Sequence, residues 1–170
     1  DEKKMLLYSE KLTAHYRINP SLIEYSTMGY IYSISSHIRA LIQNNKTDKA
    51  WEEIEVLENL ENELNINNSM HLQARVFLYS LNLRMELYML FNQHDKCAKW
   101  IENKKNELVK FESFISKPFL YECYFLMAKH YFITGDYKKA LLYSNKIIND
   151  IDSKLRADIL SEIRLLNLLI

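Results

Sequence analysis

The segment YFLMAKHYFITGDYKKA, residues 124–140, decides the fold class. Its first half carries apolar residues at three- and four-residue intervals, which predicts an amphipathic helix, and Gly135-Asp136 is a typical helix-ending turn. Ala128 and Ala140 lie on either side of this turn, and their small side chains would let two helix backbones approach closely. The segment therefore predicts a helical hairpin, with two antiparallel helices joined by a tight connection.

Composition extends the helical prediction to the whole chain. Hydrophobic residues make up 48% of the 170 residues and charged residues 26%, which is ordinary for a folded domain, but only two glycines and two prolines are present. Sandwiches, barrels and dinucleotide-binding folds need many turns, and those turns need glycine and proline. We therefore expect an all-α protein of about eight helices.

Charge and cysteine content narrow the function classes. The 22 basic and 22 acidic residues balance, which argues against a nucleic-acid partner, and no apolar run approaches the roughly 20 residues of a membrane span. Cys97 and Cys123 have no C-x-x-C partner and no zinc-like spacing, so we expect two structural, reduced thiols, with a redox or bridging role as the alternative. We expect a cytoplasmic protein, and the frequent Asn, Ile, Lys and Tyr suggest a bacterial source. Because the chain begins at Asp1 rather than Met, an export signal stays open as an alternative.

Apolar periodicity and polar breaks together predict the helix positions. Either Asn19 or Ser21 can cap the second helix, and Ser21 and Glu24 have the spacing of a capping box. Ser69 is a candidate N-cap, and Pro118 suits a first helical turn. We expect helices over about residues 2–17, 21–43, 48–64, 70–92, 95–114, 118–134, 137–150 and 153–170.

A weak internal repeat accompanies this pattern. Three polar turns each lead into a helix with an early alanine, at Ala50, Ala98 and Ala140, which are 48 and then 42 residues apart. The repetition favours a stack of helical hairpins. A non-repeating helical bundle stays as the alternative, because any bundle can place alanine near its turns.

Residues 121–152 resemble a tetratricopeptide repeat (TPR). The family's small residue on the first helix matches Ala128, and its aromatic residue one turn later matches Tyr131. Its turn matches Gly135-Asp136-Tyr137, and its small residue on the second helix matches Ala140. The resemblance implies a TPR-like right-handed superhelix of antiparallel helical hairpins, used for binding proteins or peptides.

The sequence also departs from the family pattern. The proline that often closes a repeat is missing near Asp152, and Ser144 stands where a large aromatic residue is common. The earlier hairpins keep the alanine but lose the glycine and most aromatic residues, and their spacing exceeds the roughly 34 residues of a TPR.

The last twelve residues, 159–170, are apolar on nearly every face, which predicts a helix buried on more than one side. We therefore expect residues 1–170 to form a single TPR-like domain that is part of a longer protein, or that forms a homo-oligomer through this helix. The oligomer version would place Leu165, Leu166 and Leu169 in a self-contact.

Sequence signals for catalysis, cofactors and metals are missing. No two of the five histidines lie three or four residues apart, and no glutamate lies three residues before any of them. The sequence also has no nucleophile elbow, P-loop or dinucleotide fingerprint. We expect no enzyme. The helix over residues 48–64 is strongly acidic, which indicates a solvated face or, as the sharper alternative, a docking site for a basic partner.

The resemblance implies a set of peptide-groove residues on the first helix of each hairpin. For the middle hairpin, a turn one residue longer would align Tyr88 with Tyr131. The groove candidates are Tyr32, Arg39, Asn82, Glu86, Glu122, Phe125, Lys129 and Phe132. Such a mixed set suits an extended peptide or helix held by hydrogen bonds and aromatic contacts.

We therefore expect a non-catalytic scaffold module that binds a protein or peptide, without a cofactor and without contact to nucleic acid or membrane. One alternative is a peptide-sensing regulatory domain of a bacterial transcription regulator, which predicts a helix-turn-helix domain upstream of Asp1. A second alternative is a structural oligomerisation segment.

Overall fold

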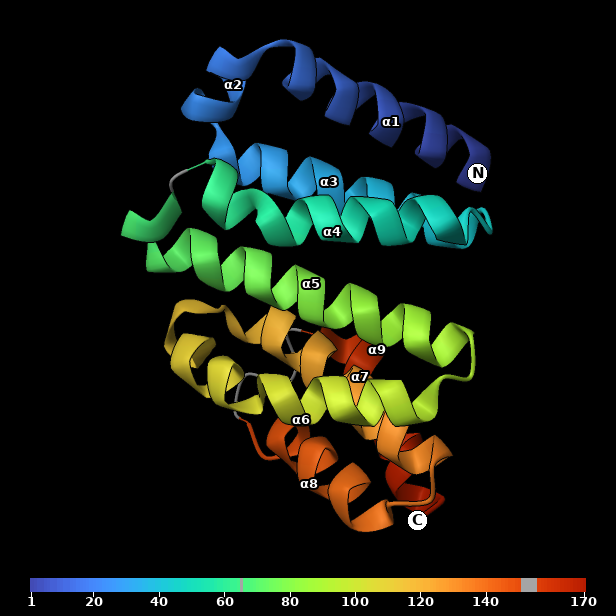
Figure 1. Cartoon of the computed structure of the whole chain (residues 1–170). Helices are drawn as coiled ribbons and strands as arrows, with labels where there is room; N and C mark the ends of the chain where they lie inside the picture. Colours follow the sequence, from blue (N-terminus) through green and yellow to red (C-terminus); the bar gives the residue numbers. More distant parts are fainter. Residues whose placement is uncertain (65, 151–155) are drawn as a thin grey trace. The chain divides into compact units, whose positions relative to one another are not determined.

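The computed structural model describes residues 1–64, 66–150 and 156–170, which form helices joined by short connections, with no strand among them (Figure 1). Two short 3₁₀ helices, η1 (Ile66–Asn68) and η2 (Glu112–Phe114), lie between α-helices. The described α-helices are α1 (Glu2–Ile18), α2 (Pro20–Tyr25), α3 (Thr27–Gln43), α4 (Thr47–Glu63), α5 (Met70–Leu90), α6 (His94–Phe111), α7 (Lys117–Ile133), α8 (Tyr137–Ile148) and α9 (Ala157–Leu168). The all-α prediction is confirmed.

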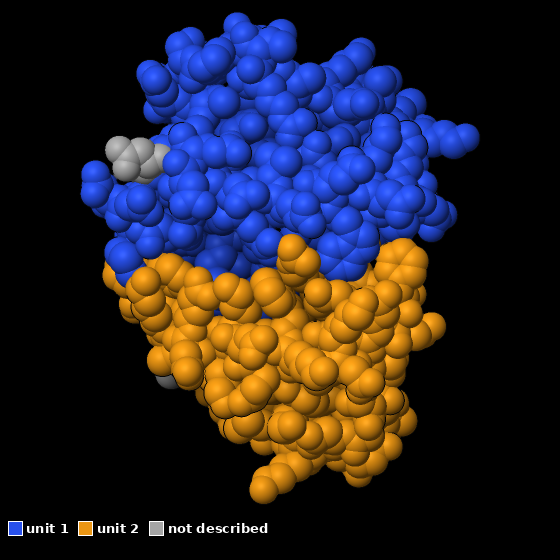
Figure 2. Space-filling view, viewed as in Figure 1, with its two compact units in different colours: residues 1–83 blue, residues 84–170 orange. Residues whose placement is uncertain are grey.

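The chain divides into two compact units, residues 1–83 and residues 84–170 (Figure 2). The division falls inside α5, so Met70–Leu83 belongs to the first unit and Arg84–Leu90 to the second. Each unit is described by itself.

In the first unit, α3 is the central helix and packs on both α1 and α4. Its fully buried residues Ile31, Ile34 and Ile38 recur at three- and four-residue spacing, so they line one continuous face. Ile54 and Leu57 of α4 are equally buried. Burying each such side chain contributes roughly 1.5–3 kcal/mol. The core therefore explains why α3 is apolar while α4 is amphipathic.

In the second unit, α7 packs on α6, α8 and α9. Ala128 of α7 and Ala140 of α8 are both fully buried, as close approach of the two helices requires. The Tyr131 ring stacks on the Tyr143 ring, with centroids 5.8 Å apart and planes 4° from parallel. The hairpin predicted from residues 124–140 is confirmed as α7 and α8.

Three helix connections share one backbone geometry. Each contains a residue in the left-handed region: Asn45 at φ 58°, Asn92 at φ 54° and Gly135 at φ 79°. The next residue donates its N–H to the carbonyl five positions back, at 2.8–2.9 Å, and the left-handed residue donates to the carbonyl three positions back, at 3.0–3.1 Å. This is the Schellman motif of helix C-termini. The same turn therefore joins α3 to α4, α5 to α6 and α7 to α8.

These turns correct the sequence alignment of the hairpins. The fourth residue after each helix cap is Ala50, Cys97 or Ala140, and all three are fully buried. Ala98 was expected at this position, but it lies one residue later and is only half-buried. The turn before α6 is therefore no longer than the other two, and the expectation of a turn one residue longer was wrong. Tyr88 still aligns with Tyr131, because the carbonyl of each accepts the equivalent N–H and Cys97 takes the place expected for Ala98.

The prediction of one helix over residues 21–43 was wrong, because the chain breaks at Ser26 into α2 and α3. Ser26, Thr27 and Gly29 are poor helix formers, and the Thr27 hydroxyl donates to the Ile23 carbonyl at 2.9 Å. A Cβ on Gly29 would also collide with the hydroxyls of Tyr16 and Ser26, so α1 and α3 approach closely here.

The capping box predicted for Ser21 and Glu24 was also wrong. Helix α2 begins at Pro20, whose fixed φ suits a first helical position, so Ser21 already lies inside the helix. The preceding Asn19 makes no side-chain cap bond, and its amide donates to the His15 carbonyl at 2.8 Å. The cap predicted at Ser69 is confirmed, since its hydroxyl accepts from the Leu72 N–H at 3.4 Å.

The C-terminal helix is more one-sided than its sequence suggested. Ile159, Leu160, Ile163 and Leu166 are buried, and α9 packs on α7 and α8. Its opposite face remains exposed. The predicted helix start at Ser153 and the family's closing position at Asp152 lie outside the described residues. Both cysteines are buried and form no disulfide, which agrees with the structural thiols expected from the sequence.

Candidate functional site

In the first unit, the predicted groove residues Tyr32 and Arg39 lie on the solvent side of α3. Tyr32 is 58% exposed and Arg39 is half-buried. Tyr79 of α5 is close to both, because their side chains act electrostatically on its hydroxyl. Arg75 lies over the Tyr79 ring at 5.5 Å. Burial raises the pKa of Tyr79, so it stays a neutral hydrogen-bonding phenol. Tyrosine and arginine thus gather on one face of this unit.

On α5, the structure separates the two predicted groove residues. Asn82 is only 1% exposed, so its side chain offers almost no surface to a partner. Glu86, which belongs to the second unit, is half-buried. Side chains four residues apart point in slightly different directions around the helix axis. One of them can therefore be covered by neighbouring helices while the other is partly exposed.

In the second unit, the predicted groove residues form a stripe along α7. Lys129 is exposed, while Glu122, Phe125 and Phe132 are half-buried. The Phe132 ring contacts Tyr137 of α8, with centroids 5.8 Å apart. Their spacing of three and four residues keeps these side chains on one helix face.

Because the three turns have the same geometry, residues of the three preceding helices can be compared by their distance in sequence from the turn. Counted back from the left-handed residue of each turn, Arg39, Glu86 and Lys129 occupy the same place. By the same count, Tyr32 corresponds to Tyr79. The first helix of each hairpin thus presents a charged side chain at the same position.

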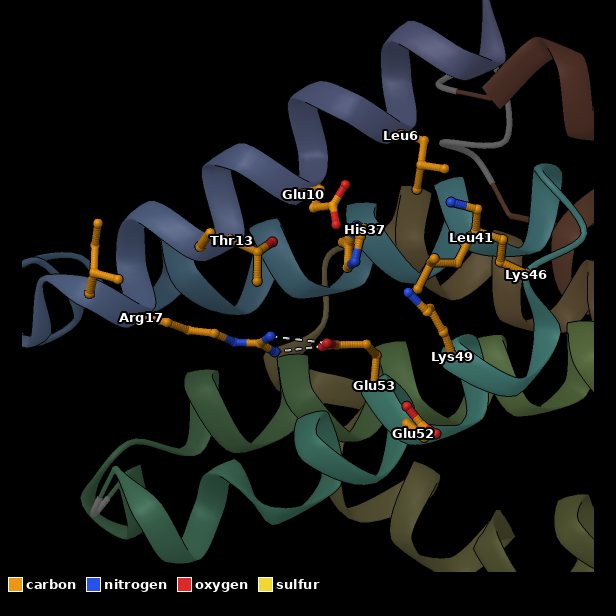
Figure 3. A pocket seen from close by; sticks show the side chains of 12 residues that line it. Leu6, Glu10, Thr13, Arg17, His37, Leu41, Lys46, Lys49, Glu52 and Glu53 are labelled. Atoms are coloured by element: carbon orange, nitrogen blue, oxygen red, sulfur yellow. Dashed lines mark hydrogen bonds and ion pairs between the residues drawn. The ribbon is translucent and has the colours of Figure 1, made fainter.

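A cleft that the sequence did not indicate lies in the first unit, with α1 and α4 as its walls and α3 as its floor (Figure 3). Its volume is about 400 Å³. The cleft combines apolar, acidic and basic side chains, which are Leu6, Glu10, Thr13, Ala14, Arg17, Ile18, His37, Leu41, Lys46, Lys49, Glu52 and Glu53.

One end of the cleft is crossed by an ion pair. The Arg17 guanidinium donates two parallel hydrogen bonds to the Glu53 carboxylate, at 3.0 and 2.5 Å, as Figure 3 shows. This forked arrangement is the strongest form of an arginine–carboxylate contact. The hydrogen bond to Glu53 raises the pKa of Arg17 above its ordinary value, against the opposing effect of burial.

His37 lies at the floor of the cleft and is buried. Its Nδ1 is 3.2 Å from the Ser9 hydroxyl, which itself donates to the Leu6 carbonyl at 3.0 Å. Since the Ser9 proton is already engaged, the imidazole donates to the Ser9 oxygen, which is not the arrangement of an activated nucleophile. Burial lowers the pKa of His37, while Glu53 and Glu10 partly oppose that effect.

The cleft could not have been found by sequence pattern. Arg17 and Glu53 are 36 residues apart and carry no shared motif. Within the part of the chain that the structure describes, no cluster of three His, Cys, Asp or Glu side chains has the arrangement to hold a metal ion. No described helix combines the length and the hydropathy that a membrane crossing needs.

Comparisons with models of known protein families, with curated proteins and with solved structures find no match to this chain.

Proposed function

We propose that this chain is a non-catalytic, TPR-like module that binds a protein or peptide through the exposed face of α3 in the first unit or that of α7 in the second. The observation that carries the proposal is the shared turn geometry, which gives Arg39, Glu86 and Lys129 equivalent positions on successive hairpins. Repeated hairpins with polar and aromatic side chains at one position are suited to holding an extended or helical segment.

The side chains of these faces support the same proposal. Tyr32 is a large, half-apolar group with more than half its surface in water, and Arg39 lies two turns further along α3. Tyrosine and arginine are the residues most enriched at energetically important positions of protein interfaces. On α7, Phe125 and Lys129 offer an apolar and a cationic contact one turn apart.

Selection of a random peptide library on the full chain tests this proposal. Enriched peptides are labelled, and their affinities are measured by fluorescence polarisation for the native chain and for Tyr32→Ala and Lys129→Glu. We expect at least one of these variants to weaken binding by about tenfold or more, which corresponds to the loss of one good contact. Neither variant should change the melting temperature by more than a few degrees, because both side chains are exposed.

Matched controls come from exposed residues away from these faces. Tyr25 of α2 is 90% exposed, and Lys11 of α1 is exposed, so Tyr25→Ala and Lys11→Glu make the same chemical changes elsewhere. Both controls should leave the affinity unchanged. The proposal fails if no peptide is enriched, or if the controls weaken binding as much as the face variants.

An oligomerisation segment is a second candidate, favoured by one specific observation. Leu165, Leu168 and Leu169 of the C-terminal region are 63%, 83% and 72% exposed, so they form an apolar patch. Leu166, expected in the same self-contact, is instead buried within the fold. Light scattering over a concentration series tests this candidate: a dimer that becomes monomeric in Leu165→Glu and Leu168→Glu supports it, and a wild-type monomer at all concentrations rejects it.

A further inference from the structure

The charges on the two walls of the first unit's cleft are arranged in complementary order. Along α4, Lys46 and Lys49 come first and Glu53 follows one turn later. Along α1, Glu10 comes first and Arg17 follows two turns later. Figure 3 shows Glu10 directed into the cleft from α1, with the lysine side chains entering from the α4 side. Each wall therefore presents both signs of charge.

Among the described residues, only one pair of opposite charges forms an ion pair across the cleft. Arg17 and Glu53 form the forked ion pair across the cleft. By contrast, Glu10, Lys46 and Lys49 form no ion pair within the described part of the chain. Glu10 on one wall and two lysines on the other are thus left without an ion pair here, and Glu52 adds a further carboxylate to the α4 wall.

The open end also has an apolar floor. Leu6 and Leu41 line the cleft there, and both are buried in the core. A second cavity of about 440 Å³ shares Leu6, Glu10 and Lys46 with the first, and continues past Asn44. The open end is therefore roomy enough for a small molecule, with apolar surface below and charge of both signs at the rim.

We propose that the open end of this cleft binds a small aliphatic zwitterion, namely a free α-amino acid or a short peptide. The ammonium group pairs with Glu10, the carboxylate pairs with Lys46 and Lys49, and the aliphatic side chain rests on Leu6 and Leu41. This site does not include Tyr32 or Arg39 of the α3 face. It can therefore be tested independently of the proposed peptide-binding function.

The charge arrangement selects against simpler ligands. A ligand with only a carboxylate would satisfy the lysines but bring negative charge close to Glu10. A ligand with only an amine would satisfy Glu10 but bring positive charge close to Lys49. Like charges in such contact destabilise a complex, so a ligand that carries both charges binds best. Because these groups are at an exposed rim, binding should weaken as salt is added.

Three probes of one shape test this inference on the full chain. L-Leucine carries both charges, 3-methylbutylamine lacks the carboxylate, and 4-methylpentanoate lacks the ammonium group. Binding is followed by NMR shifts of the cleft residues during titration up to about 10 mM, well above the millimolar dissociation constants expected for so few contacts. We expect L-leucine to bind at least about tenfold more tightly than either single-charge analogue.

Variants then assign the two charges. Glu10→Gln should weaken L-leucine binding by about tenfold, yet leave 4-methylpentanoate binding equal or stronger. Lys49→Gln should do the reverse, weakening the acid and sparing the amine. Lys11→Gln and Glu55→Gln alter exposed residues of the same two helices that do not line the cleft, and they should change nothing.

A final comparison separates the two sources of the zwitterion. The dipeptide Leu-Leu has its charges further apart than L-leucine, so tighter binding of the dipeptide would identify a peptide site, and tighter binding of L-leucine a free amino acid site. The inference is overturned if no probe shifts the cleft resonances, or if Glu10→Gln and Lys49→Gln bind all three probes as the native chain does. Equal binding of the three probes would also overturn it.

Discussion

Arg17 of α1 and Glu53 of α4 are joined by two parallel hydrogen bonds of 3.0 and 2.5 Å, although 36 residues separate them in the chain. Both helices pack on α3, and this ion pair connects them across the cleft between them. It closes one end of the cleft and leaves the other end open.

Removing either charge of this pair should destabilise the protein by about 1 kcal/mol, because the pair is forked but partly open to solvent. The Arg17 side chain is 39% exposed and that of Glu53 is 17% exposed, which limits the contribution. Urea unfolding of Arg17→Gln, Glu53→Gln and the double variant gives the coupling free energy. A coupling of zero would show that the pair contributes nothing beyond its separate residues.

Because His130 of α7 is buried, we expect the protein to lose stability in mild acid. His130 is fully buried, and neither ring nitrogen has a hydrogen-bond partner among the described residues. The His94 ring is 5.9 Å away, and burial, His94 and Lys139 together lower the pKa of His130 below 6.5. The folded state therefore resists protonation, while the unfolded state takes up the proton. The contribution of neutral His130 to the free energy of unfolding is fully present above about pH 6.5 and is lost as the pH falls below that value.

The slope of that loss can reach about 1.4 kcal/mol per pH unit for each excluded proton. His130→Leu should make the free energy of unfolding less dependent on pH between 6.5 and 4.5, measured by urea unfolding at each pH. His37, whose pKa is also lowered by burial, keeps a residual slope in this variant. An unchanged slope in His130→Leu would contradict the prediction.

The three left-handed turn residues should respond differently to substitution. Gly135 has φ 79°, and a Cβ there would meet no atom within 4 Å, so Gly135→Ala carries only the backbone cost of about 1 kcal/mol. Asn45 and Asn92 adopt the same left-handed conformation, which asparagine tolerates better than most residues other than glycine. Asn92→Gly should therefore change the free energy of unfolding by less than about 0.5 kcal/mol. A cost for Gly135→Ala no larger than that would disprove the role assigned to this turn.

Both thiols should be unreactive in the folded protein. Burial raises the pKa of Cys97 to about 12 and that of Cys123 further above its usual range, so the reactive thiolate is scarce at pH 8. Mass spectrometry after brief treatment with iodoacetamide should find no labelled cysteine in the native chain and two in urea. Rapid labelling of either cysteine without denaturant would place that thiol at the surface.

Much of the secondary structure could be predicted because helix signals are local. Apolar periodicity, turn residues and helix caps predict the hairpin at residues 124–140 and the helix starting at Met70, and each of these signals acts within a few residues. The break at Ser26 was missed because the apolar periodicity continues across it, and the close approach of Tyr16 to Gly29 involves a different helix. Cys97 was missed because the sequence alignment relied on alanines, whereas the backbone hydrogen bonds of the turn at Asn92 place Cys97 at the buried position.

The sequence by itself determined the helical class, the hairpin of α7 and α8 and the positions of most helix ends. These follow from hydrogen bonding and side-chain spacing within single helices and turns. Only the tertiary structure decided that Asn82 is buried while Tyr32 is exposed, that His130 has no polar partner among the described residues, and that Arg17 meets Glu53. Such contacts depend on how helices distant in the chain pack together, and side-chain periodicity within one helix carries no information about its neighbours.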